Sequence, residues 1–404
     1  MASIYKTPGV YREEIFLKPE AQLPTGVPGF VGFADAGSQG GPEFNTPVAL
    51  HRKEDFAATF SSRPESFLGE TVTGFFDNGG TRCYVVRADP DGDRIAALQN
   101  ALGALAPLND LDLVAAPDAM TLLLSNGKLD VPAIVQVQQQ TLSHCAELGN
   151  RLAILDALPQ RTTDGILDQR HKLTVGQAEP VNGALYYPWI KTVGERGERL
   201  APPCGHVAGI FARTDARVGV FKAPANEEIF GVFDLGVRVP KPDDPDQEID
   251  GEIEIDNSIQ DQLNPEGVNC LRAFRGRGIR VWGARTLSSD PNWRYVNVRR
   301  LFLTLNRWID MNMAFATFEP NEPRLWARIQ RELTTYLTKL ARDGALKGAT
   351  PDQAFFVKCN AETNPPELRE VGQVVTEIGL APLSPAEFIV VRIIHRASAT
   401  DSLQ

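Results

Sequence analysis

The chain has 404 residues, of which 43% are hydrophobic and 23% charged, and its formal net charge is −10. This length suffices for two or three domains with separate cores, and no stretch approaches 18 uncharged apolar residues, so no membrane-spanning helix is expected. The overall acidity argues against general nucleic-acid binding. The N-terminus lacks the apolar core of a secretory signal.

Five widely spaced cysteines occur, and no two of them form a CxxC pair. An odd number without metal-type spacing predicts reduced thiols in the core of a protein made in the cytosol. They are Cys83, Cys145, Cys204, Cys270 and Cys359.

Residues 1–25 are predicted to form an arm and not the start of a domain. After a Pro8-Gly9 break the chain alternates from Val10 to Leu17, which indicates one strand without a local hairpin partner. Such a strand can dock on its own subunit or be donated to the sheet edge of a neighbour. The residues that would carry this pairing are Val10, Tyr11, Glu13, Ile15 and Leu17.

Residues 26–278 alternate between strand and helix patterns. Helices are expected at 54–60, 66–78, 94–105 and 131–150, and strands at 28–37, around 83–86, at 111–119 and at 151–159. This order predicts an open α/β sheet over about 30–280.

The α/β region lacks the motifs of the common enzyme classes. GRGIRVWG at 276–283 has no third glycine and does not open a helix, and no GxxxxGK[ST], GxSxG or HExxH occurs. The five histidines lie far apart, which favours structural roles. We therefore expect no catalytic residue and no cofactor.

The acidic run DDPDQEIDGEIEID at 243–256 has partial calcium-loop spacing. Its twelfth position would be Asn257, which cannot supply a bidentate carboxylate, and Pro242 and Pro245 oppose an entering helix. The alternation of Ile249, Ile253 and Ile255 with acids instead predicts a solvated edge strand, so no metal is expected.

Residues 279–404 are predicted to be an α+β domain with two amphipathic helices. Between Leu271 and Lys347 there are 15 Lys and Arg against 6 Asp and Glu, although the rest of the chain has 26 against 45. This local excess predicts either a solvated helix face or a surface that docks an acidic partner. The candidate docking residues are Arg299, Arg300, Arg307, Arg324, Arg328 and Arg331. Asn321 is expected to cap the second helix and Gly344 to end it.

Several blocks in this order resemble the contractile tail sheath proteins of myophages, R-type pyocins and extracellular contractile injection systems. The blocks are YKTPGVYREEI, TGVPGFVGFADAG, FFDNGGTRCYVVR, GHVAGIFARTDARVGVFKAPAN and NCLRAFRGRGIRVWGARTL, and the similarity runs from the arm to the last strand. The compact length resembles that of pyocin and injection-system sheaths.

The resemblance implies a structural subunit that assembles helically around an inner tube and contracts to drive that tube through a target envelope. It implies partners in further copies of this chain, the tube protein, and baseplate and cap proteins, without nucleic acid or membrane insertion. Assembly would occur in the bacterial cytoplasm, within a phage tail or a released tail-like particle. Residues 26–278 would face outward and 279–404 the tube, with a C-terminal strand carrying Ile389, Val391 and Ile393 in the exchange between subunits. The alternatives are a nucleic-acid-binding protein that uses the basic helices and an α/β hydrolase.

Overall fold

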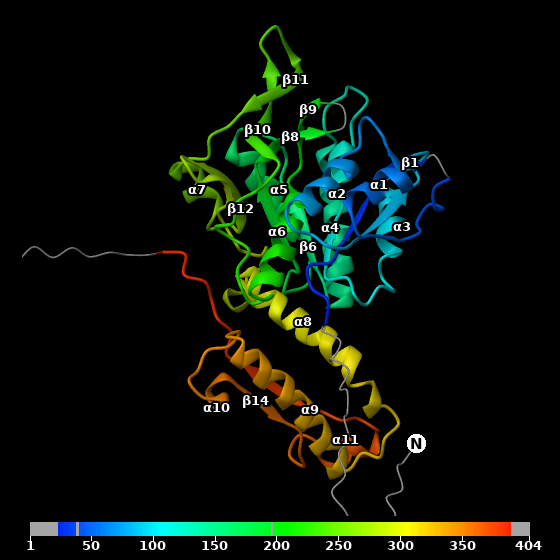
Figure 1. Ribbon diagram of the computed structural model, residues 1–404, viewed down its shortest axis with the longest axis vertical. Coiled ribbons are helices and arrows are strands. Elements are labelled where there is room, and N and C mark those ends of the chain that lie inside the picture. Colours follow the sequence, from blue (N-terminus) through cyan, green and yellow to red (C-terminus); the bar gives the residue numbers. More distant parts are fainter. Residues whose placement is uncertain (1–22, 38–39, 195–196, 389–404) are drawn as a thin grey trace, which may run out of the picture.

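A computed structural model describes residues 23–37, 40–194 and 197–388 of the protein. Its largest element is a mixed sheet of nine strands in the order β13-β12-β7-β6-β5-β1-β4-β2, with β3 paired to β1 (Figure 1). The strands are β1 (Pro28–Ala36), β2 (Val48–Leu50), β3 (Phe60–Ser62), β4 (Cys83–Ala88), β5 (Leu113–Ala115), β6 (Leu152–Asp156), β7 (Gly183–Tyr187), β12 (Val268–Phe274) and β13 (Gly278–Val281). The six strands from β12 to β4 run parallel, which agrees with the predicted α/β region.

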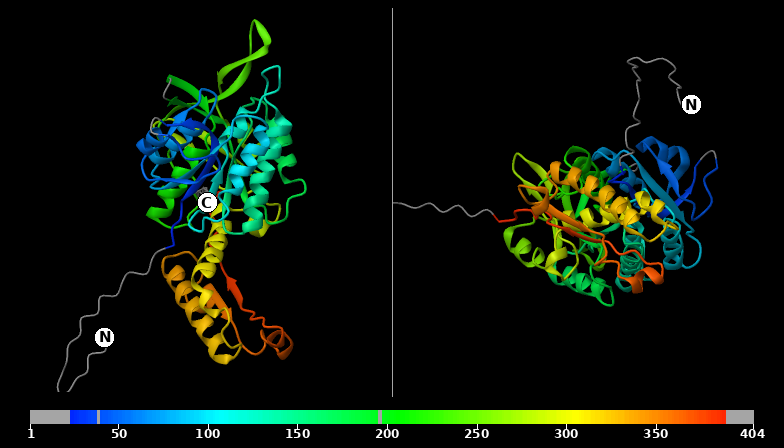
Figure 2. Two further views of the ribbon diagram at one scale, coloured as in Figure 1. Left: turned by 90° about the vertical axis from the view of Figure 1, so that its right-hand side faces the viewer. Right: turned by 90° about the horizontal axis from the view of Figure 1, so that it is seen from below.

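Helices cover this sheet in two groups. Helix α2 packs against α6, whereas α3 packs against α4 and α4 against α5 (Figures 1 and 2). The helices are α1 (Lys53–Thr59), α2 (Leu68–Asp77), α3 (Arg94–Gly103), α4 (Val131–Leu148), α5 (Thr163–Thr174), α6 (Cys204–Arg217) and α7 (Asn257–Leu263), with a 3-10 turn at Pro117–Thr121. All five cysteines are free and buried, as predicted, and burial raises the pKa of Cys145 and Cys270 to about 12.

A second sheet has four antiparallel strands in the order β11-β10-β8-β9. They are β8 (Trp189–Gly194), β9 (Gly197–Ala201), β10 (Val232–Lys241) and β11 (Asp244–Glu252). The acidic run therefore lies on an edge strand, as predicted, and the β10–β11 hairpin extends from one end of the molecule (Figure 1). Acidic side chains on such an edge discourage uncontrolled pairing with other chains.

Helix α8 (Val296–Asn312) links this large unit to a smaller C-terminal unit, as Figure 2 shows. The smaller unit contains α9 (Pro323–Arg342), α10 (Pro351–Ala354), β14 (Phe355–Lys358), α11 (Pro366–Glu370) and β15 (Glu377–Leu380), preceded by 3-10 turns at Pro291–Trp293 and Ala314–Ala316. β14 and β15 form a separate two-stranded antiparallel sheet.

The expected domain boundary at 278/279 falls inside a hairpin. Strand β13 pairs antiparallel with β12, with Leu271 opposite Val281, so the chain leaves the large sheet only after β13. The prediction placed the chain from Ile279 onward in the C-terminal domain, whereas residues 278–281 form β13 at the edge of the large sheet.

The cap of α9 also differs from the prediction. Glu322 and not Asn321 is the N-cap, while Pro323 begins the helix and Gly344 follows its end with φ of +83°. The Asn321 side chain instead accepts a hydrogen bond from Trp326 Nε1 at 2.8 Å. The proposed pairing residues Val10 to Leu17 and Ile389 to Ile393 lie outside the described residues.

Candidate functional site on helices α8 and α9

Helix α8 is buried on two sides because it contributes to two hydrophobic cores. Val296 and Leu303 belong to the core of the large unit, whereas Leu301 and Leu305 pack in a cluster with Leu337 of α9. A helix with apolar contacts on two faces leaves little of its surface for solvent. Its arginines must therefore find partners inside the protein.

Arg300 is fully enclosed and bonded to two carboxylates. Its guanidinium forms two hydrogen bonds with Asp215 of α6, at 2.8 and 2.6 Å, and one with Asp112, at 2.8 Å. Burial opposes the charge of Arg300, but the two carboxylates outweigh that effect and raise the pKa of the guanidinium above its ordinary value. Bidentate pairing supplies the geometry that a buried ion pair needs.

The same cluster holds residues 24–27, where the predicted N-terminal arm would end. Asp112 accepts hydrogen bonds from the backbone N–H groups of Gly26 at 3.1 Å and Val27 at 2.7 Å. Arg307 donates from Nη2 to the carbonyl of Pro24 at 2.6 Å, and its Nη1 lies 3.8 Å from Asp112. One charge cluster thus binds both α8 and residues 24–27.

Gly26 makes this close approach possible. Its φ is +69°, and a Cβ atom there would lie 2.5 Å from the Cα of Ala212 in α6. Only glycine satisfies both the backbone conformation and the spacing.

Arg299 binds the large unit on another side of α8. Its Nε donates to Asn182 Oδ1 at 2.6 Å, and its guanidinium lies 4.8 Å from the ring centre of Trp293. Burial without a carboxylate lowers the pKa of Arg299 to about 10. Arg299, Arg300 and Arg307 are each at least 91% buried, so the prediction that they form an exposed docking face is wrong. Their loss from the surface also weakens the nucleic-acid alternative.

Helix α8 also binds the last described residues of the chain. Asn297 donates from Nδ2 to the carbonyl of Leu383 at 3.0 Å, and Arg285 donates from Nε to Glu387 at 3.0 Å. Asn297 and Arg307 are ten positions apart, or about 15 Å along a helix. Pro24 and Leu383 are therefore both bonded to α8, whereas Glu387 is bonded to Arg285, which precedes that helix in the chain.

Helix α9 presents its arginines to solvent. Leu325, Trp326, Ile329, Leu333 and Leu337 form its buried stripe, largely as predicted from the 3.6-residue period. Arg324, Arg328 and Arg331 are exposed on the remaining surface. Arg328 stacks over the ring of Phe315 at 3.8 Å from its centre, and Arg331 pairs with Glu332 at 3.2 Å. These three side chains are exposed, so they remain candidates for docking a partner.

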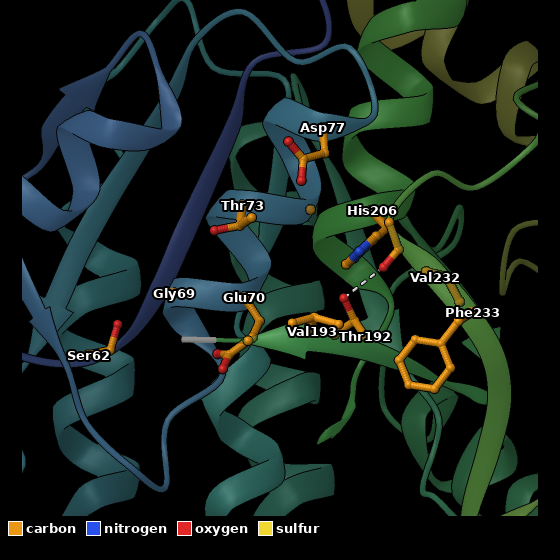
Figure 3. Close-up of a pocket in the computed structure, with 13 residues that line it drawn as sticks. Ser62, Gly69, Glu70, Thr73, Asp77, Thr192, Val193, His206, Val232 and Phe233 are labelled. Atoms are coloured by element: carbon orange, nitrogen blue, oxygen red, sulfur yellow. Dashed lines mark hydrogen bonds between the residues drawn. The ribbon is translucent and has the colours of Figure 1, made fainter. Parts of the chain in front are cut away.

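A cavity of about 510 Å³ lies between α2, α6, β8 and β10 (Figure 3). Glu70 and Asp77 line it but are already paired, with Arg199 at 2.9 Å and Lys53 at 3.0 Å. Burial lowers the pKa of His206 to about 4, so its imidazole is neutral at pH 7.

Within the described residues, no group of three His, Cys, Asp or Glu side chains could hold a metal ion. In the same part of the chain, no helix is long and apolar enough to cross a membrane.

Comparison with known proteins agrees with the resemblance seen in the sequence. Residues 133–287 match the phage tail sheath protein central domain, and residues 288–396 match the phage tail sheath C-terminal domain. A putative prophage major tail sheath protein of Pseudomonas aeruginosa (strain UCBPP-PA14) is 24% identical over 364 residues, which is 88% of each chain. The tail sheath protein of Enterobacteria phage T4 is 25% identical over 207 residues, covering 50% of this chain and 28% of that protein.

Solved sheath structures have the same fold over nearly the whole chain. The helical sheath of the anti-feeding prophage in its contracted state matches with a TM-score of 0.73 and 27% identity, covering 97% of this chain and 100% of that one. The sheath complex of the extracellular contractile injection system PVC, also contracted, matches with a TM-score of 0.70 and 27% identity, covering 98% and 99%. The chain therefore belongs to the contractile tail sheath proteins.

Reasoning from the sequence missed the residues that anchor the terminal segments. Asp112 and Asp215 carry no motif, and neither is close in sequence to the arginines that they bind. The one available signal was Gly26, a glycine between two prolines where the arm enters the domain.

Proposed function

We propose that this chain is the repeating subunit of a sheath that polymerises helically around an inner tube and contracts to drive the tube through an envelope. The observation that carries this proposal is the match, over 97% of the chain, to a helical sheath in its contracted state. The extended sheath would be a kinetically trapped lattice whose subunits rotate as nearly rigid bodies when a baseplate signal frees one end. This mechanism needs no nucleotide and no cofactor.

The two-stranded sheet β14–β15 is our candidate acceptor for the arms. Within the described residues each strand pairs with no strand but the other, so the second edge of each has no strand beside it, although Gln330 Nε2 of α9 donates to the carbonyl of Val357 in β14 at 3.0 Å. We propose that the strand at Val10–Leu17 of one copy and the strand at Ile389–Ile393 of another add to these edges. Head-to-tail joints of this kind do not close on themselves and so generate a helix.

The anchoring on α8 gives these joints a mechanical role. A load on either arm reaches residues 24–27 or 383–387, which are bonded to α8 and to the residues packed around it. The subunit can then rotate as a body while the arm joints remain paired. The exposed arginines of α9 would dock the tube through charge pairs worth about 0–1 kcal/mol each, weak enough to break in succession.

Electron microscopy of the purified chain, with and without its tube protein, tests the proposal. Deletion of residues 1–20 should abolish long sheaths yet leave a folded subunit, because the deletion stops before the bonds at Pro24, Gly26 and Val27. Normal tubular assembly by the truncated chain would rule out the arm exchange.

A further inference from the structure

The turn between α8 and α9 contains a residue that does not suit its backbone. The N–H of Glu319 donates to the carbonyl of Ala316, Thr317 has φ of −70° and ψ of 129°, and Phe318 has φ of +66°. These angles describe a type II turn, whose third position requires a positive φ and is normally glycine or asparagine. Phenylalanine is strained there because its Cβ crowds the backbone.

Phe318 differs from other positions with the same conformation. Among the described residues, the other non-glycine residues with positive φ are Asn45 and Asn226. Asparagine tolerates this region of backbone space, whereas a bulky aromatic does not. The positive φ of Phe318 is therefore not explained by the backbone preference of phenylalanine.

The ring of Phe318 is also not buried against the rest of the subunit. Its exposure is 103%, against 76% for Phe388, the next most exposed large apolar residue in the described chain. Phe315, three positions earlier, differs because it is partly buried, packs against the core of the C-terminal unit and is covered by the guanidinium of Arg328. A position that breaks a local rule and returns no packing is typical of a functional site.

The turn is also ordered and adjacent to the exposed basic residues. Thr317 N–H donates to Ala314, Glu322 N–H to Pro320, and Pro323 begins α9. Glu319 and Glu322 add negative charge on the turn itself, and Arg324 and Arg328 follow in the first two turns of the helix. The ring thus projects from a hydrogen-bonded turn that carries two exposed glutamates and is followed in the chain by two exposed arginines.

We propose that Phe318 is an apolar anchor that inserts into a recess on the inner tube protein, with carboxylates at the rim of that recess facing Arg324 and Arg328. This inference rests on the proposed function, because it requires α9 to face the tube. An aromatic side chain surrounded by charged residues is the usual form of a binding hot spot, and a rigid turn lowers the entropy lost on docking. The strain in the free subunit is then a cost of presenting the ring.

The substitution Phe318→Gly separates docking from folding because the two roles predict opposite changes. Glycine suits the turn, so the subunit should melt at an equal or higher temperature. Loss of the buried ring should raise the concentration needed for half-maximal assembly on preassembled tubes of the cognate tube protein by about ten- to a hundredfold. Phe318→Leu should preserve most of the assembly, and Val175→Ser, at an exposed site on the large unit, should not affect it.

Two outcomes would overturn the inference. One is an unchanged half-maximal concentration for Phe318→Gly, and the other is a lower melting temperature, which would mean that Phe318 stabilises the fold. Reversal of Arg324, Arg328 and Arg331 to glutamate distinguishes this failure from that of the proposed function. If the reversal abolishes assembly on tubes and Phe318→Gly does not, only the anchor is wrong; if neither has an effect, docking through α9 is wrong as well.

Discussion

Helices α8 and α9 were both predicted as basic amphipathic helices, but their arginines lie in opposite environments. Each is amphipathic and carries three of the candidate arginines, yet those of α8 are buried and those of α9 are exposed. The difference comes from Asp112 and Asp215, which lie 188 and 85 positions from Arg300 and meet it only after the large unit has folded. Whether the arginines of a basic helix are exposed or buried therefore depends on carboxylates that lie far away in the sequence. The following predictions test this contrast, beginning with the largest effect.

Arg300→Met should destabilise the subunit most. The substitution leaves Asp112 and Asp215 buried without their main counter-charge, a loss of about 3–5 kcal/mol in the free energy of unfolding. Urea unfolding of the purified subunit measures it. The matched substitution Arg324→Met on α9 should change the value by less than about 0.5 kcal/mol. Equal effects at both positions would contradict the contrast.

Arg307→Met should have a smaller effect that is concentrated at the arm. Among the described residues, Nε and Nη1 of Arg307 have no hydrogen-bond partner, so the main loss is the bond to Pro24, about 1–3 kcal/mol. Limited proteolysis should then cut faster near residues 23–27, and sheaths should be shorter. Unchanged cleavage at this segment would show that Arg307 does not hold the root of the arm.

Reversal of Arg324, Arg328 and Arg331 to glutamate should leave folding almost intact and prevent assembly on tubes. All three side chains are exposed, so each change should alter the free energy of unfolding by no more than about 0.5 kcal/mol. Co-sedimentation with tubes measures docking. A control reverses Arg161, Arg275 and Arg294, which are exposed on or beside the large unit. Equal loss in both triple variants would indicate a general charge effect.

Salt should have the smallest of these effects, and it should act on the exposed arginines of α9 and not on the buried arginines of α8. Raising the ionic strength from about 0.05 to 0.5 M shortens the range of exposed charges and should weaken sheath assembly on tubes. The melting temperature of the isolated subunit should change little, because the cluster at Arg300 is screened by protein and not by solvent. A large fall in that temperature would mean that solvent reaches the cluster.

Regular elements were predictable because their signals are local. The strand and helix order from β1 to β6, apart from the short strands β2 and β3, follows from the spacing of apolar residues, as do the edge strand β11 and the buried stripe of α9. The contractile sheath family was recognisable from blocks spread along the chain, and the comparisons confirm it. The domain boundary was misplaced because the sequence does not show that β13 pairs with β12 in the large sheet.

The functional positions were harder to predict because their signals are not local. A helical wheel places Arg299, Arg300 and Arg307 on a polar face but cannot show that Asp112, Asp215 and Asn182 are opposite them. Phe318 sits in a turn without glycine, so the sequence gives no sign that its φ is positive. The acceptor edges of β14 and β15 became visible only with the sheet topology.

Cryo-electron microscopy of the extended sheath assembled on its tube tests the central claim most directly. We predict density that joins the tube to Phe318, Arg324, Arg328 and Arg331 of α9, with Arg300 still bonded to Asp112 and Asp215 inside each subunit. A map in which α9 faces outward, or in which the arginines of α8 leave those aspartates to contact the tube, would contradict the account.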